Sequence, residues 1–207
     1  MPDLNPLSAT FALLDYAGVA VFAASGALAA ARYKHTIVTF AFFAAVTGVG
    51  GGTLRDLLIG APVFWVQNQL YLAVCLGMAL LVWVTRADRW PAATLLWLDA
   101  AGMAVYAVVG AAKAMSYGVP PLPCMVMGVL TASFGGIVRD VLANEPSILL
   151  RPEIYLSAAA LAATVFLVLA AMGLPPLIAG AIGAAAGFVL RAGALRFGWT
   201  LPGYRRV

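Results

Sequence analysis

Two stretches of this 207-residue chain repeat one pattern, and that pattern decides the fold. Residues 47–56 read TGVGGGTLRD, and residues 131–140 read TASFGGIVRD, at an offset of 84. The same offset aligns residues 14–72 with 98–156 without a gap, giving 20 identities in 59 positions. The matches include residues that a bias toward Ala and Gly cannot explain: Asp15 with Asp99, Pro62 with Pro146, and Tyr71 with Tyr155. The sequence therefore predicts an internal duplication.

The composition predicts a protein that resides in a membrane. Hydrophobic residues make up 64% of the chain and charged residues 10%, and the mean hydropathy is +0.99. A soluble domain has about a quarter of its residues charged, so 12 basic and 8 acidic residues are too few to cover a water-exposed surface. Disordered chains and disulfide-stapled secreted domains are excluded as well. In this context a net charge of +4 does not indicate nucleic-acid binding.

A membrane-spanning helix needs about 20 mostly apolar residues, and the chain offers seven such segments. The predicted spans are 10–31, 36–59, 67–85, 94–114, 122–143, 153–172 and 175–196. Because each copy of the repeat holds three spans, an odd number, the second copy must cross the membrane in the opposite direction. The predicted fold class is an all-α integral membrane protein with seven transmembrane helices, arranged as an inverted 3 + 3 repeat plus one. Its expected parts are a first repeat at 10–86, an inverted second repeat at 94–172, and a seventh helix with a cytoplasmic tail at 173–207.

The glycine runs predict that the second and fifth helices are broken. Each glycine disfavours a helix by about 1 kcal/mol relative to alanine. Broken backbone at membrane depth is tolerated only inside protein or beside a water-filled cavity, where its freed polar groups can bind ions. The alternative is that these glycines only let helices approach closely. The candidate pore-lining residues are Thr47, Gly50, Gly51, Gly52, Thr131, Ser133, Gly135 and Gly136.

An Arg-Asp pair follows each glycine run, at Arg55-Asp56 and at Arg139-Asp140. A charge at the centre of a membrane helix costs on the order of 3 kcal/mol, so these residues need partners. Neighbouring helical residues point about 100° apart, which favours pairing across the repeat axis, Arg55 with Asp140 and Arg139 with Asp56. These four residues are interpreted either as a structural clamp or as the polar wall of a permeation path.

Three further charges lie in apolar segments. Asp15 and Asp99 match in the repeat, and each either favours a helix N-terminus or attracts cations into a vestibule. Lys113, whose counterpart is Ala29, either extends its ammonium group to the membrane surface or acts as a mobile tethered cation. All three are candidates for a vestibule or a gate.

The basic residues predict the orientation. Nine of them fall on one side of the seven spans, against Lys113 on the other: Arg32, Lys34, Arg86, Arg89, Arg151, Arg191, Arg196, Arg205 and Arg206. By the positive-inside rule the N-terminus lies outside and the C-terminus in the cytoplasm. Two scattered cysteines and one histidine offer no metal site and no catalytic pair, so no enzyme activity and no cofactor are expected.

The duplicated Gly-Gly-x-x-Arg-Asp element at 51–56 and 135–140, with Pro-Val-Phe-Trp at 62–65, resembles the prokaryotic trimeric intracellular cation (TRIC) channel family. The resemblance implies a homotrimer in the inner membrane, with a pore in each protomer between the broken second and fifth helices. It implies passive flux of K⁺ and Na⁺ across the lipid bilayer, and neither cofactor nor nucleic acid. A secondary transporter for a small solute such as an amino acid is the alternative, because inverted repeats with discontinuous helices occur in transporters too and glycine transport has been proposed for bacterial relatives.

Overall fold

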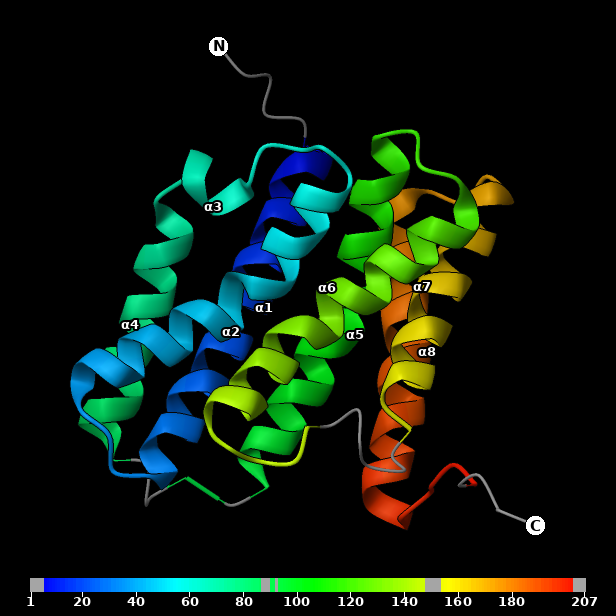
Figure 1. The fold of residues 1–207 in the computed structure, drawn as a ribbon. Coiled ribbons are helices and arrows are strands. Elements are labelled where there is room, and N and C mark those ends of the chain that lie inside the picture. The colour runs from blue at the N-terminus through cyan, green and yellow to red at the C-terminus, as the bar shows by residue number, and fades with distance from the viewer. Residues whose placement is uncertain (1–5, 87–89, 92, 148–153, 203–207) are drawn as a thin grey trace.

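The computed structural model describes residues 6–86, 90–91, 93–147 and 154–202. Helices account for almost all of the described backbone (Figure 1). Their bounds are α1 Pro6–Arg32, α2 Ile37–Leu58, α3 Phe64–Gln67, α4 Leu70–Thr85, α5 Thr94–Ser116, α6 Pro121–Leu142, α7 Leu156–Ala171 and α8 Pro176–Phe197. In Figure 1, α2 and α6 cross in front of α1 and α5, with α4 on one side and α7 and α8 on the other.

The helices follow the predicted spans closely. Apart from the four-residue α3, each helix matches one predicted span, and its ends differ from the prediction by four residues at most. Five helices are long and apolar enough to cross a membrane, while α4 and α7 have 16 residues each, fewer than the roughly 20 that a perpendicular crossing needs. The predicted class, an all-helical membrane protein, is confirmed.

Contacts between α1 and α5 are reciprocal at the offset of 84. A Cβ atom built on Gly18 would lie 2.8 Å from the ring of Tyr106, and one built on Gly102 would lie 3.0 Å from the ring of Phe22. The two rings stack with centroids 5.4 Å apart. Since the earlier residue of one helix meets the later residue of the other, α1 and α5 are antiparallel, as expected for an inverted duplication.

The glycine-rich helices α2 and α6 cross in the same reciprocal way. A side chain at Gly51 would clash with the carbonyl oxygen of Thr131, and a side chain at Gly135 would clash with the carbonyl oxygen of Thr47. Both helices continue through their glycines without interruption, so the predicted break is not seen in the backbone. The physical reason is packing: the missing side chains let the two backbones touch, and this contact offsets the low helix propensity of glycine.

The ends of α2 and α6 also repeat. Gly60 and Asn144, equivalent residues, follow the two helices in the left-handed conformation, with φ of 69° and 52°. Glycine and asparagine are the residues that adopt this conformation most readily. The next amide in each copy donates back to the helix, Ala61 to the carbonyl of Asp56 and Glu145 to that of Asp140. This turn places each Arg-Asp pair at the last turn of its helix.

Candidate functional site

Two cavities that include charged side chains in their linings lie toward opposite ends of the bundle. The Lys113 cavity has a volume of about 480 Å³ and the Arg139 cavity about 170 Å³. The Lys113 cavity is lined by Asp15, Phe64, Tyr71, Val109, Ala112, Lys113, Met115, Ser116, Phe166 and Pro176. The Arg139 cavity is lined by Ala29, Arg32, Tyr33, Leu95, Leu96, Asp99, Arg139, Asp140, Ala143 and Glu145.

The two cavities are related by the repeat. Asp15 of one cavity is equivalent to Asp99 of the other, and Lys113 is equivalent to Ala29. Because α1 and α5 are antiparallel, their equivalent residues lie toward opposite ends of the bundle (Figure 1). One cavity therefore lies toward each end of the bundle, and the two differ in volume and in most of their lining residues.

Asp56 is the centre of the charge cluster beside the Lys113 cavity. Its carboxylate is fully buried and accepts from Arg55 Nε at 2.9 Å and from Lys113 Nζ at 2.8 Å. The backbone N–H of Phe64, at the start of α3, donates to the same carboxylate at 3.0 Å. The Phe64 ring lies 5.9 Å from the Arg55 guanidinium and 5.8 Å from the Lys113 ammonium group, within the range of a cation–π contact. Nearby, Tyr71 donates its hydroxyl to Asp15 at 2.8 Å.

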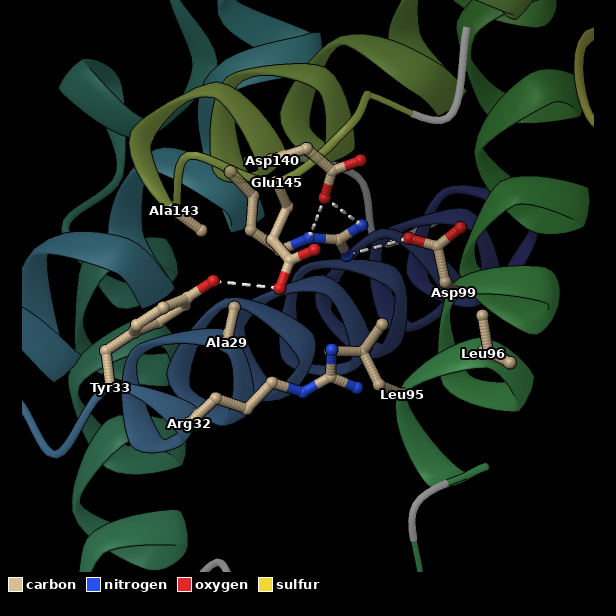
Figure 2. Close-up of a pocket in the computed structure, with 10 residues that line it drawn as sticks. Ala29, Arg32, Tyr33, Leu95, Leu96, Asp99, Asp140, Ala143 and Glu145 are labelled. Atoms are coloured by element: carbon tan, nitrogen blue, oxygen red, sulfur yellow. Dashed lines mark hydrogen bonds and ion pairs between the residues drawn. The ribbon is translucent and has the colours of Figure 1, made fainter. Parts of the chain in front are cut away.

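Arg139 is the centre of the second cluster. Its Nη1 donates to Asp99 Oδ1 and to Ser25 Oγ, both at 2.9 Å. Its Nε and Nη2 donate to Asp140 Oδ1, also at 2.9 Å. Figure 2 shows Asp99 and Asp140 approaching the guanidinium from two sides. Buried charges are tolerated when they are paired and hydrogen-bonded in this way, so the cluster holds α1, α5 and α6 together.

A hydrogen bond lies beside the Arg139 cavity. The Tyr33 hydroxyl, in the turn after α1, donates to Glu145 Oε1 at 2.8 Å, and Figure 2 shows this bond between two residues that line the cavity. The hydrogen bond to Glu145 raises the pKa of the Tyr33 phenol above its ordinary value of 10.0. The phenol is therefore a neutral donor throughout the physiological pH range.

The predicted pairing of the four repeat charges across the axis is wrong. Each arginine instead binds the aspartate that follows it, Arg55 with Asp56 and Arg139 with Asp140. The helices cross midway between the Gly51–Thr131 and Thr47–Gly135 contacts, near positions 49 and 133. Each arginine lies six residues further along its helix, and because the helices are antiparallel the two arginines lie about 9 Å from the crossing in opposite directions, at 1.5 Å per residue. The long arginine side chain spans the 100° between neighbouring positions, which the prediction treated as unfavourable for pairing.

Two predictions for the remaining charges need correction. Neither α1 nor α5 has an acidic residue in its first turn, so Asp15 and Asp99 do not act at helix N-termini and instead line the cavities. Lys113 does not extend to the membrane surface, because its ammonium group is held by Asp56 and its side chain is only 27% exposed. This ion pair joins α5 to α2, and the sequence alone does not show that Asp56 lies next to Lys113 in the fold.

The eight predicted pore-lining residues lie between the two cavities, at and around the crossing of α2 and α6. Gly51, Gly52, Gly135 and Gly136 are buried, and Gly50 is partly buried. A Cβ atom built on Gly50 would lie 3.8 Å from the Cα atom of Gly135. Thr131 and Ser133 are buried and donate their hydroxyls within α6, to the carbonyls of Met127 and Val129. The buried Thr47 hydroxyl has no hydrogen-bond partner among the described residues. None of the eight lines either cavity as the structure describes them.

Sequence reasoning missed several residues that complete the clusters. Ser25, Tyr71 and Tyr155 were not singled out as site residues, although the two tyrosines match in the repeat and that match is a usable signal. Arg191, one of the nine basic residues behind the predicted orientation, is buried in α8 with 2% exposure. Of the other eight basic residues behind the orientation, Arg32, Lys34, Arg86 and Arg196 are exposed, while Arg89, Arg151, Arg205 and Arg206 lie outside the described residues.

The fold and the site define an all-helical, multi-pass membrane protein whose equivalent helices α1 and α5, and α2 and α6, pack antiparallel, with a cavity that contains charged side chains toward each end. Comparison with known proteins gives its family. A family model described as "Glycine transporter" matches the chain twice, over residues 12–87 and 96–171, two segments offset by 84. A membrane protein of Vibrio cholerae, described as a UPF0126 protein, is 38% identical over 92% of this chain and 81% of its own length. An Escherichia coli K12 inner membrane protein of the same description is 43% identical over 70% of this chain and 72% of its own length.

Solved structures agree with these relatives. The TRIC trimeric intracellular cation channel orthologue from Rhodobacter sphaeroides has a TM-score of 0.89 and 44% identity, covering 92% of this chain and 99% of that one. A prokaryotic TRIC channel solved in 0.5 M KCl has a TM-score of 0.85 and 25% identity, covering 94% and 100%. The chain therefore belongs to the TRIC/UPF0126 family, as the duplicated motif predicted. Members of this family are membrane and channel proteins and not enzymes.

Proposed function

We propose that this protein is a monovalent cation channel that conducts K⁺ and Na⁺ through a path inside each protomer. The observation that carries the proposal is the pair of repeat-related cavities, each lined by an aspartate, which approach the α2–α6 crossing from opposite ends. The path runs from the Lys113 cavity, past the crossing, into the Arg139 cavity. Membership of a family whose similar solved structures are cation channels supports the same function.

The crossing of α2 and α6 is the constriction on this path. Gly51 packs against the Thr131 carbonyl and Gly135 against the Thr47 carbonyl, so ion passage requires the two helices to shift. Hydroxyl and carbonyl oxygens from Thr47, Thr131 and Ser133 are then the groups that replace water around the ion. The unpartnered Thr47 hydroxyl supports this role, because a buried hydroxyl without a partner is costly unless water or an ion reaches it.

The charges beside the cavities set the local potential. Arg55, Asp56, Arg139 and Asp140 clamp the helix ends, while Asp15 and Asp99 face the two cavities and attract cations. Because each cluster mixes acidic and basic groups, the preference for cations over anions is modest, and K⁺ and Na⁺ both pass. Lys113 competes with the ion for Asp56 and is the group on this path best placed to gate it.

The assembly and the location follow from the family and the charges. We place the protein in the inner membrane of a prokaryotic cell as a homotrimer in the lipid bilayer, each protomer consisting of two inverted three-helix repeats and a seventh helix. The excess of exposed basic residues at the Arg139 end supports a cytoplasmic location of that end and of the C-terminus. The Lys113 cavity then faces the outside.

The proposed function is tested by reconstituting the full chain in a planar bilayer under a KCl gradient and measuring the reversal potential. A single-channel current whose reversal potential is shifted from zero toward the K⁺ equilibrium potential supports the proposal. We expect a current of similar size when NaCl replaces KCl at the same concentrations. The absence of current, or reversal at the chloride potential, overturns it. Saturable uptake of glycine into proteoliposomes, driven by an ion gradient and without ohmic current, indicates a transporter instead.

A further inference from the structure

Phe64, in the Pro-Val-Phe-Trp segment at 62–65, lines the Lys113 cavity and packs directly against α2. A Cβ atom built on Gly52 would lie 2.6 Å from the Phe64 ring, and the three atoms nearest to that Cβ all belong to this ring. Gly52 is the neighbour of Gly51, at which α2 meets the backbone of α6. The ring therefore covers the glycine run beside the helix crossing.

The Phe64 ring stands between the Lys113 cavity and buried groups of α2. Three neighbours of Phe64 on this helix are buried and do not line the cavity: Gly52, Arg55 and Asp56. The ring lies over Gly52 and within cation–π range of Arg55, and the backbone N–H of Phe64 donates to Asp56. The ring is therefore the part of the cavity wall that separates the cavity from the glycine run.

Contacts on several sides hold the ring in this place. The Tyr71 ring of α4 meets it edge to face, with centroids 4.6 Å apart, and the Lys113 ammonium group lies 5.8 Å from its centre. The next residue, Trp65, donates its indole N–H to the Thr53 hydroxyl of α2 at 2.8 Å. The position of the ring thus depends on the short α3 and on two cations, and a ring on a short segment can move without displacing a long helix.

We propose that Phe64 is the gate of the Lys113 cavity: its ring closes the cavity toward the α2–α6 crossing and has to leave Gly52 before an ion reaches that crossing. This inference rests on the proposed cation path and adds to it a residue that closes one end. Because Lys113 contacts both the ring and Asp56, an ion that competes with Lys113 for Asp56 also loosens a contact that holds the ring.

The test measures the mean closed time of single channels in a planar bilayer with KCl on both sides. Phe64→Ala removes two cation–π contacts and one aromatic contact that hold the closed arrangement, so the mean closed time falls on the order of tenfold. Phe42→Ala is the control, since it removes an exposed ring from α2, and it keeps the closed time of the parent.

Gly52→Ala displaces the same ring from the other side. The new methyl group meets the ring, which has to move, so the closed time shortens in this variant as well. Gly50→Ala is the matched control, because its methyl group lies 3.8 Å from the nearest atom, an ordinary contact. In the double variant Phe64→Ala/Gly52→Ala the two effects do not add, since no ring is left to displace. A merely structural role of Phe64 does not predict this coupling, and additive effects overturn the inference.

The outcomes separate this inference from the proposed function. A parent protein without K⁺ current overturns the function and this inference with it. A parent that conducts without closing, or whose folded Phe64→Ala variant keeps the same closed time, overturns this inference alone. Where Phe64→Ala fails to yield a monodisperse protein, Phe64→Leu, which keeps an apolar side chain and removes both cation–π contacts, is measured in the same way and carries the same two outcomes.

Discussion

Lys113 of α5 forms an ion pair of 2.8 Å with Asp56 of α2, although the position equivalent to Lys113 in the other copy of the repeat is Ala29. The lysine is 27% exposed and lines a cavity, whereas Asp56 is fully buried. In the proposed cation path, this lysine is the group that a mobile cation has to displace in order to reach Asp56. The two halves of the protein are therefore related in shape and different in charge.

Lys113→Met is expected to raise the K⁺/Cl⁻ permeability ratio on the order of threefold, because it removes a positive charge from the wall of the cavity and frees Asp56 to attract cations. The measurement is the reversal potential in a planar bilayer under a KCl gradient. Lys34→Met is the matched control, since Lys34 is the only other lysine of the chain and is exposed. Equal ratios for the Lys113→Met variant and the parent would contradict the prediction.

The duplication explains how much of the fold the sequence predicts. The matched Asp, Arg and Gly residues at one offset predict the inverted halves, and the apolar segments predict the helix positions to within a few residues. The charge pairing is not predictable in this way, because it depends on how far Arg55 and Arg139 lie from the crossing and on how their side chains bend back to Asp56 and Asp140.

The glycines and the seventh helix show a second limit of the sequence. A run of glycines is consistent both with a broken helix and with close packing, and only the contact between Gly51 and the Thr131 carbonyl distinguishes the two. Arg191 resembles a surface charge because it lies near the end of an apolar segment. Its burial depends on the packing of α8 against α7, where Gly183 and Gly187 lie close to Ala162. Arg191 lies four residues after Gly187, so the spacing of these glycines is the signal in the sequence for its burial.

Gly51→Ala and Gly135→Ala are expected to destabilise the protein strongly, because the new methyl group meets a backbone carbonyl that cannot move without displacing a helix. The cost is on the order of 1–3 kcal/mol for each overpacked site. The measurement is the thermal midpoint of the detergent-solubilised protein by size-exclusion chromatography. Gly77→Ala is the control, since no atom lies within 4 Å of the added Cβ and alanine favours the helix there. A midpoint for Gly51→Ala as high as that of Gly77→Ala would refute the packing account.

Arg139→Met is expected to cost about 3–5 kcal/mol, because it leaves the buried carboxylate of Asp99 and the neighbouring Asp140 without their shared cation. Arg139→Lys retains the charge but cannot contact Asp99, Asp140 and Ser25 together, so its loss is smaller. The same thermal assay measures both, with the exposed Arg196→Met as the control. If Arg139→Met and Arg196→Met melt alike, Arg139 is not the centre of a structural cluster.

The bond between Tyr33 and Glu145 predicts an alkaline transition at the Arg139 end. The bond joins two residues that line the cavity, and we expect it to restrict ion entry while the phenol is protonated. Because the hydrogen bond raises the pKa of Tyr33 in the folded protein, its contribution is fully present below pH 10.0 and is lost as the pH rises through the raised value. We therefore expect the unitary K⁺ current to rise when the solution on that side is taken from pH 8 to above pH 10.

Tyr33→Phe removes the hydroxyl and keeps the ring, so its current is already high at pH 8 and does not rise further with alkali. Lys34→Gln is the control for the neighbouring ammonium group, and this variant keeps the transition of the parent. A parent and a Tyr33→Phe variant with the same pH profile would show that the bond does not restrict the path. A transition that disappears in Lys34→Gln instead would assign it to the lysine.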